Sequence, residues 1–200
     1  KSLNRVLVSV ICFIMLFTTG SILAADEADA YADGAVCYIG DNEETGTKFT
    51  SIKAAIESLG SCNRTTIHLL CDTTWDGMEI NKGEDFAIDG TKPDGKYTLT
   101  LLGNVTVKTY STRAYFTNVT IDLNQHHFVI GGNGELHLEN GSVLKNGYDS
   151  SNGGGAAFAE ASTIKMFEGS VVEDCSAKGN GGAFRLNGVK GFYMYGGEIR

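Results

Sequence analysis

Side chains with catalytic or metal-binding potential are few in this 200-residue sequence. The one adjacent pair of histidines is His126 and His127, and neighbouring side chains on a strand point to opposite faces, so the two rings do not converge on a metal ion. The glycine-rich stretch 131–134 is followed neither by a helix signal nor by the Lys-Ser/Thr pair of a phosphate-binding loop. We therefore predict no metal ligand and no cofactor.

Four charged residues late in the chain could meet on one flank of a coil, and they fit a solvated loop face equally well: Glu173, Asp174, Lys178 and Arg185. Glycosidic hydrolysis needs a pair of carboxyl groups that flank the bond, and no motif here assigns such a pair. We therefore predict no catalytic residue, and the residues that bind a partner stay open.

Cysteines near the start of the chain are candidates for a disulfide. Two of the three residues Cys37, Cys62 and Cys71 could pair in an oxidising compartment. Cys175 lies about a hundred residues further on, so in a stacked fold several layers of about 4.8 Å would separate it from them. That is beyond the Cα distance of about 7 Å that a disulfide spans. The alternative is that all four are reduced, buried apolar residues.

Asn-x-Ser/Thr sequons occur at four positions: Asn63, Asn104, Asn118 and Asn140. In a eukaryotic secretory pathway they would be glycosylation candidates. In a bacterium they would be ordinary Asn and Thr residues of β corners.

An internal repeat is the strongest structural signal in the sequence. Its apolar residues recur at 28-residue intervals at Leu136, Ile164 and Phe192, and its glycines at Gly141, Gly169 and Gly197. Because side chains alternate along a strand, we expect like residues to stack in inward columns. Besides the first apolar set, these columns are Leu138, Met166 and Met194, and Val143, Val171 and Ile199.

The residues between the inward ones should point to solvent, and they form the column His137, Lys165 and Tyr193. A second corner of the repeat consists of two Gly-Gly-Ala units that contain Gly154, Gly155, Gly181 and Gly182. Phe158 and Phe184 follow these units, and we expect them to be equivalent. The aromatic set Phe167, Tyr193 and Tyr195 suggests either an exposed stripe for sugar or protein contact, or stacking between coils.

The remaining pattern favours many short strands over helices. Strand-like runs lie at 66–70, 86–88, 97–102, 105–107, 119–123, 128–130 and 135–138. Residues 49–59 predict an amphipathic helix with Ser51 as its cap. Because a sandwich has no reason to repeat residue types at fixed phase, we predict an all-β, single-stranded parallel β-helix with an N-terminal capping helix.

Three segments divide the chain. Residues 1–25 predict a secretory signal peptide, 26–47 an acidic lead-in, and 48–200 the parallel β-helix, truncated at its C-terminal end because the third repeat is incomplete. The net charge of −8 argues against nucleic acid and anionic lipid as partners. We expect membrane contact only through the signal or an unseen C-terminal anchor, and a secreted or cell-surface location.

Residues 48–200 resemble the right-handed parallel β-helix superfamily of pectate-lyase-like proteins, on the amphipathic opening 49–56, the strand 66–70 and the coil 119–130. The Gly-Gly-Ala units, with Phe184 and Asn187 after the second, are similar to repeats of the chlamydial polymorphic outer membrane proteins and other surface adhesins. Lyases of this superfamily hold Ca²⁺ on stacked outward carboxylates, whereas the outward column here contains His137, Lys165 and Tyr193.

These resemblances imply an exported surface protein that is adhesin-like or surface-structural, and a binding protein rather than an enzyme. Its expected partner is a protein or polysaccharide on a host or neighbouring cell. The alternatives are a polysaccharide lyase or hydrolase whose catalytic coils lie beyond residue 200, and a purely structural stalk.

Overall fold

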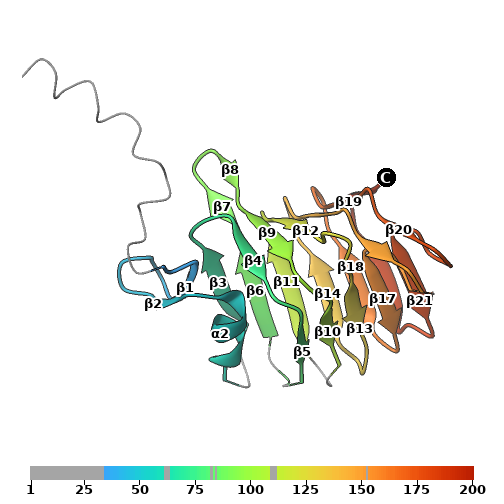
Figure 1. Cartoon of the computed structure of the whole chain (residues 1–200), viewed down its shortest axis with the longest axis horizontal. Coiled ribbons are helices and arrows are strands. Elements are labelled where there is room, and N and C mark those ends of the chain that lie inside the picture. Colours follow the sequence, from blue (N-terminus) through green and yellow to red (C-terminus); the bar gives the residue numbers. More distant parts are fainter. Residues whose placement is uncertain (1–33, 61–63, 82, 84, 109–111, 152) are drawn as a thin grey trace, which may run out of the picture. The chain divides into compact units, whose positions relative to one another are not determined.

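The chain forms a parallel β-helix in which successive coils add strands to three sheets (Figure 1). The structure is a computed structural model that describes residues 34–200 except 61–63, 82, 84, 109–111 and 152. Within these residues, the first sheet runs in the order β2 (Thr47–Phe49), β1 (Cys37–Ile39), β3 (Thr65–Leu69), β6 (Asp85–Asp89), β11 (Arg113–Thr117), β14 (Glu135–Leu138), β18 (Thr163–Met166) and β22 (Gly191–Met194).

The other two long sheets are parallel throughout. The second contains β5 (Met78–Ile80), β10 (Val105–Val107), β13 (Phe128–Ile130), β17 (Ala157–Glu160) and β21 (Phe184–Asn187). The third contains β4 (Thr73–Trp75), β9 (Thr98–Leu101), β12 (Thr120–Asp122), β15 (Val143–Lys145), β19 (Val171–Glu173) and β23 (Glu198–Ile199). The all-β parallel β-helix predicted from the repeat is therefore confirmed.

Two short pairs decorate the corners. An antiparallel pair joins β7 (Thr91–Lys92) to β8 (Gly95–Lys96), and a parallel pair joins β16 (Tyr148–Asp149) to β20 (Ser176–Ala177). The second pair lies in the segments that precede β17 and β21.

The N-terminal end is covered by helix α2 (Ile52–Glu57), whose first turn is capped by the Ser51 hydroxyl accepting from the Ala54 amide at 3.1 Å. Ile52, Ala55 and Ile56 are buried beneath it, as their spacing predicts. The helix is shorter than the predicted 49–59, because Phe49 ends strand β2 instead. Strand β1 lies inside the range predicted as a lead-in, yet it pairs antiparallel with β3 in the first sheet.

The interior changes along the stack. In the early coils Trp75 packs against three aromatic rings at centroid distances of 6.2–6.5 Å: Phe86, Phe116 and Phe128. Each of the four is at most 1% exposed, and full burial of such a side chain contributes about 1.5–3 kcal/mol. In the later coils the interior of β17 is lined by Ala157 and Ala159.

The register of the strands follows the repeat in the first sheet. Leu136 is opposite Ile164 and Ile164 opposite Phe192. The column of Leu138, Met166 and Met194 aligns in the same way.

The third predicted inward column, in the third sheet, is wrong. Val143 and Val171 are opposite each other but only half-buried, and the buried residues are their neighbours Leu144 and Val172. Ile199 is opposite Val172 rather than Val171, because the loop before β23 is one residue shorter than the loop before β19.

Glycines fill the corners where coils touch. Gly141 and Gly169 have φ of 73° and 77°, and a Cβ at either position would meet the side-chain oxygen of Asn118 or Asn140 in the neighbouring coil. The equivalent turn of the last coil contains Gly197, with φ of 87°.

The two Gly-Gly-Ala units stack directly on each other. The Gly155 amide donates to the Gly182 carbonyl at 2.8 Å, and a Cβ on Gly154 or Gly155 would collide with backbone atoms of the next coil. Gly181 takes a positive φ of 76°. The predicted equivalence of Phe158 and Phe184 is wrong: Phe184 is opposite Ala157, so Phe158 faces outward opposite Arg185.

Candidate binding face

The outer side of the first sheet carries three rows of side chains that run across the coils. Strand register gives the middle row as Ala87, Tyr115, His137, Lys165 and Tyr193. On one side of it lies the row Asp85, Arg113 and Glu135. On the other side, directly after the ends of β14, β18 and β22, lie Glu139, Phe167 and Tyr195. We refer to these rows together as the outer face.

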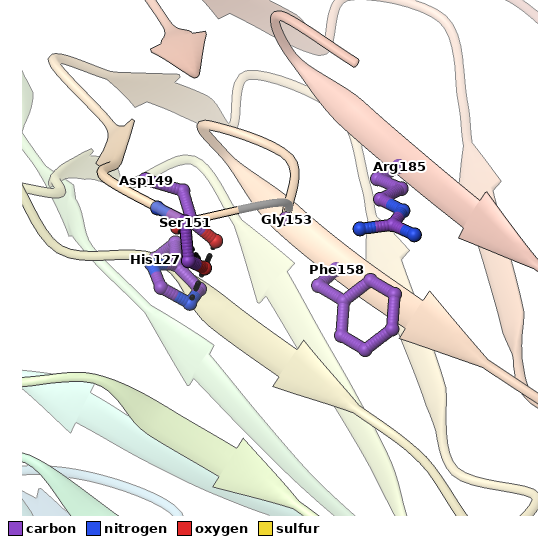
Figure 2. Close-up of a pocket in the computed structure, with 6 residues that line it drawn as sticks. All are labelled: His127, Asp149, Ser151, Gly153, Phe158 and Arg185. Atoms are coloured by element: carbon purple, nitrogen blue, oxygen red, sulfur yellow. Dashed lines mark hydrogen bonds and ion pairs between the residues drawn. The ribbon is translucent and has the colours of Figure 1, made fainter. Parts of the chain in front are cut away.

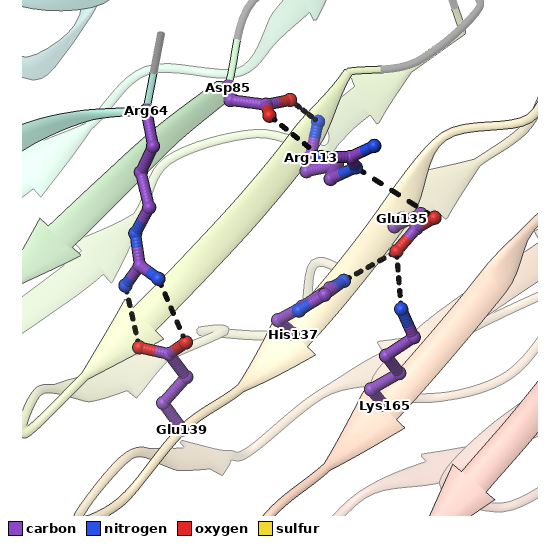
Figure 3. Close-up of polar contacts among 7 residues, drawn as sticks. All are labelled: Arg64, Asp85, Arg113, Glu135, His137, Glu139 and Lys165. Carbon is purple, nitrogen blue, oxygen red and sulfur yellow. Dashed lines mark hydrogen bonds and ion pairs between the residues drawn. The ribbon is translucent and has the colours of Figure 1, made fainter.

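Glu135 is the centre of a charged network on this face (Figure 3). Its Oε2 accepts from Nζ of Lys165 at 2.8 Å and lies 2.6 Å from Nε2 of His137. Its Oε1 lies 3.9 Å from Nε of Arg113, whose Nη1 in turn lies 3.2 Å from Oδ2 of Asp85. Acid and base thus alternate along the row and neutralise one another.

Glu139 is held by a second basic group that comes from the start of the first coil. Nη1 and Nη2 of Arg64 donate to its two carboxylate oxygens at 3.1 and 2.7 Å, and Oγ1 of Thr117 donates at 2.7 Å. The Arg64 guanidinium also lies 4.0 Å from the ring centroid of Tyr115. The residue of β6 opposite Tyr115 is Ala87, whose methyl group leaves room for the long arginine side chain to cross β6 (Figure 3).

The protonation states follow from burial and from these contacts. Burial, together with the charge of Lys165, lowers the pKa of His137, although Glu135 acts in the opposite direction. Burial alone would raise the pKa of Glu135, but the hydrogen bonds from Lys165 and His137 outweigh it and the pKa is lowered. The pKa of Glu139 is lowered in the same way by Arg64. At neutral pH, therefore, both carboxylates are ionised and neutral His137 donates Nε2–H to Glu135.

A continuous series of planar side chains, each in contact with the next, runs across the outer face beside this network. The ring centroids of Tyr115 and His137 are 4.4 Å apart, and those of His137 and Phe167 are 6.2 Å apart. Phe167 stacks on Tyr195 at 5.2 Å, and Tyr195 on Tyr193 at 6.1 Å with only 6° between the ring planes. Tyr193 is 44% and Tyr195 63% exposed, so these two rings present an aromatic surface to solvent. We refer to Phe167, Tyr193 and Tyr195 as the aromatic platform.

The outward column predicted from the repeat differs in one member. His137, Lys165 and Tyr193 do lie side by side on the outer face. His137, however, is only 6% exposed, because its outward neighbours Tyr115 and Phe167 and its partner Glu135 surround the ring. An outward position on a crowded sheet is thus not always a solvated one.

The other singled-out polar residues do not converge. His126 lies in a turn and His127 in a separate pocket beside Asp149. Of the loop cluster, Glu173 pairs with Arg200 and Arg185 lies over the ring of Phe158. Within the described residues, no group of three or more His, Cys, Asp or Glu side chains is arranged to hold a metal.

Of the candidate disulfide pairs, only Cys37–Cys71 can be judged from the described residues. Cys37 is buried and Cys71 partly buried, and both are free thiols, so these two do not form a bridge. Burial raises the pKa of Cys37 to about 12, which keeps it protonated. Cys62 lies outside the described residues. Cys175 is a third free thiol, on the later coils.

The sequon asparagines have different surroundings. Asn104 is exposed, and its Oδ1 accepts from the His127 amide at 3.1 Å. Asn118 is half-buried at a corner and its Nδ2 donates to Thr91 at 3.1 Å. Asn140 is exposed but its side chain faces Gly169 of the next coil. Asn63 lies outside the described residues.

Sequence reasoning missed most of the charged network: Arg64, Asp85, Arg113, Glu135 and Glu139. Asp85 and Arg113 are separated by the full period of the repeat. The next step, from Arg113 to Glu135, is shorter than that period. The repeat spacing therefore does not predict that these charged residues lie in one row. The alternation Glu-x-His-x-Glu at 135–139 was the one local signal for three polar groups on one side of a strand.

Comparisons of the chain with protein-family models, with curated proteins and with solved structures found no match. The described part of the chain contains no helix of the length and apolarity needed to cross a membrane.

Proposed function

We propose that this chain belongs to an exported, surface-displayed and adhesin-like protein, and that its outer face binds an extended partner. The observation that carries the proposal is the aromatic platform, whose two tyrosines are stacked, exposed and flanked by charges that are already paired. Rigid aromatic side chains offer large contact area at a small cost in conformational entropy.

The charge pairing favours a neutral partner. Glu135 is shared between Lys165 and His137, and Glu139 between Arg64 and Thr117, so a charged ligand would have to break existing pairs. A neutral polysaccharide can instead stack its rings on Tyr193 and Tyr195. The parallel β-helix supports this because it repeats its surface along one direction, as an extended polymer does.

The resemblance of the Gly-Gly-Ala units to adhesin repeats supports surface display. The predicted signal at 1–25 supports export, and it lies outside the described residues. Hydrolysis of a polysaccharide on the outer face itself would need a protonated carboxyl as acid, whereas the contacts of Glu135 and Glu139 lower the pKa of both carboxyl groups.

Binding to insoluble neutral polysaccharides, namely cellulose, chitin and β-glucan, tests the proposal by co-sedimentation. We expect the double variant Tyr193→Ala/Tyr195→Ala to bind at least about tenfold more weakly to the polysaccharide retained, a loss of about 1.4 kcal/mol. The matched control is Leu102→Ala, which removes an equally exposed apolar side chain (51%) from a coil corner outside the outer face.

Three outcomes would contradict the proposal. Equal losses in the double variant and in Leu102→Ala would remove the platform from the binding site. Retention only by a cell-surface protein would replace the polysaccharide by a protein partner. Release of soluble sugar during the incubation would favour the enzymatic alternative.

A further inference from the structure

Asparagine followed by glycine is a chemically labile pair, and the sequence contains it six times. Because glycine lacks a side chain, its nitrogen reaches the side-chain amide carbon of the preceding asparagine with little hindrance. Five of these asparagines lie within the described residues: Asn133, Asn140, Asn146, Asn180 and Asn187. Asn152 lies outside them. Each of the five has the same following residue, so differences in their reactivity depend on the fold.

Two of these asparagines are held by their side-chain amides. Nδ2 of Asn146 donates to both carboxylate oxygens of Asp122, each at 3.1 Å. Nδ2 of Asn187 donates to Oε1 of Glu160 at 2.9 Å. In both cases the amide must leave its partner in the neighbouring coil before its carbon can be attacked.

Two others are restrained through the backbone. The glycine that follows Asn133 donates its amide to the Gly131 carbonyl at 2.9 Å, so the attacking nitrogen is engaged. The carbonyl of Asn140 accepts from the Asn118 amide at 2.9 Å, and the carbonyl of the next glycine accepts from Nζ of Lys96 at 2.6 Å. The backbone around the second pair is therefore fixed on both sides.

Asn180 is restrained in neither way. It is exposed, and glycines precede and follow it. Within the part of the chain that the structure describes, its side chain makes no hydrogen bond, and the amide of Gly181 donates none. Before it, the nearest backbone bond is from the Lys178 amide to the Asp149 carbonyl at 2.9 Å. After it, the nearest is a long contact of 3.4 Å between the Gly155 amide and the Gly181 carbonyl.

The corner of the preceding coil shows what this loop lacks. There Oδ1 of Asp149 accepts from the amide and the hydroxyl of Ser151, each at 2.6 Å (Figure 2). The residue opposite Asp149 in the next coil is Ala177. A methyl group accepts no hydrogen bond, so the segment that leads to Asn180 has no equivalent anchor.

We propose that Asn180 is a site of spontaneous covalent modification, at which asparagine is converted through a succinimide to aspartate and isoaspartate. The Gly181 nitrogen loses its proton to solvent and attacks Cγ of Asn180, and the side-chain amide leaves as ammonia. Water then opens the ring at one of its two carbonyl groups. Opening at the main-chain carbonyl leaves the backbone routed through the former side chain, which is isoaspartate.

Isoaspartate at this position adds a methylene group to the backbone where two coils stack. The Gly155 amide donates to the Gly182 carbonyl at 2.8 Å, in addition to the longer contact with Gly181. Because the corner is already close-packed, the added methylene displaces these acceptors. The modification therefore weakens the attachment of the last coil.

Peptide mapping by mass spectrometry tests the proposal on the full chain, aged in mildly alkaline buffer. We expect Asn180 to lose its amide faster than the other four described asparagines. Relative to Asn146 and Asn187 the rate should be at least about tenfold higher, equivalent to a barrier lower by about 1.4 kcal/mol. In concentrated urea, where the hydrogen bonds of the fold are lost, the five rates should be similar. An equal or slower rate at Asn180 in the folded chain would overturn the proposal, and so would an equally large difference in urea.

Two variants test the physical cause. Ala177→Asp supplies the missing anchor and should slow the reaction of Asn180 severalfold. Glu160→Ala is the matched variant, because it releases the side chain of Asn187 and should accelerate that asparagine while Asn180 keeps its rate. Unchanged rates in both variants would overturn the assignment to hydrogen bonding. If Ala177→Asp loses the β-type circular dichroism spectrum, Glu160→Ala decides the outcome.

Discussion

The coils before β14 and those from β14 onward have the same three-sheet plan but are built by different means. In the early coils the step between neighbouring strands of the first sheet varies, and the step from Arg113 to Glu135 falls short of the repeat period. From Glu135 to Thr163 and on to Gly191, each step equals the full period. The early interior is filled by aromatic rings, and the later corners by close glycine contacts. Strand register therefore does not require a constant coil length.

Removal of a large side chain from the early core should have the largest effect. Phe116 is fully buried and contacts both Trp75 and Phe128, so Phe116→Ala should lower the free energy of unfolding by about 3–5 kcal/mol. Met166→Ala in a later coil should cost less, because methionine packs less specifically. Urea unfolding followed by circular dichroism measures both. A smaller loss of unfolding free energy for Phe116→Ala than for Met166→Ala would contradict the difference between the early and the later coils.

Addition of a methyl group at the later corner should have an intermediate effect. A Cβ on Gly155 would collide with the backbone of Gly182 and Ser176, and backbone cannot move aside cheaply. Gly155→Ala should therefore lower the free energy of unfolding by about 1–3 kcal/mol. Gly182→Ala is the matched control from the stacked unit, because its nearest atom would be 3.7 Å away. Similar thermal midpoints for the two variants would show that the close backbone contact at Gly155 does not determine the stability of the corner.

A change of pH should have the smallest effect. The pKa of His137 in the folded chain is below its ordinary 6.5, so folding favours the neutral ring. The stability that depends on His137 is then present above about pH 6.5 and is lost as the pH falls through the folded-state pKa. Urea midpoints at pH 7.5 and 5.5 should differ less for His137→Gln than for the unmodified chain. His126→Gln, in a turn away from the network, should retain the full difference, and an equal reduction in both variants would rule out His137 as the source.

How much the sequence predicts depends on the same contrast. Where steps are constant, the columns of Leu136 and Leu138 follow from spacing alone. The third column fails because the choice between two adjacent valines, Val171 and Val172, depends on which one faces inward, and because the shorter loop before β23 moves Ile199 opposite Val172. Strand β11 was not predicted from the sequence. Only Ala114 and Phe116 of its five residues are buried, and an alternation this short is hard to recognise.

The candidate sites were harder to predict than the fold. The aromatic platform was visible as a set of residues, but its stacking depends on side-chain geometry. The order of reactivity among the Asn-Gly pairs depends on hydrogen bonds between coils, which follow from strand register. Charge pairing across coils is likewise a property of register, and local sequence does not contain it.

The position of Trp75 has a consequence for spectroscopy. It is the only tryptophan of the sequence, 1% exposed among the aromatic rings of the early coils, and its Nε1 lies 3.3 Å from the sulfur of Met78. Its fluorescence therefore reports the opening of one end of the stack, whereas far-ultraviolet circular dichroism averages over all strands. In a fold whose stability is close to a sum of neighbouring-coil terms, the two signals separate as soon as the coils melt one after another. The intrinsic fluorescence of Trp75 thus distinguishes fraying of one end from cooperative unfolding of the whole stack without any added label.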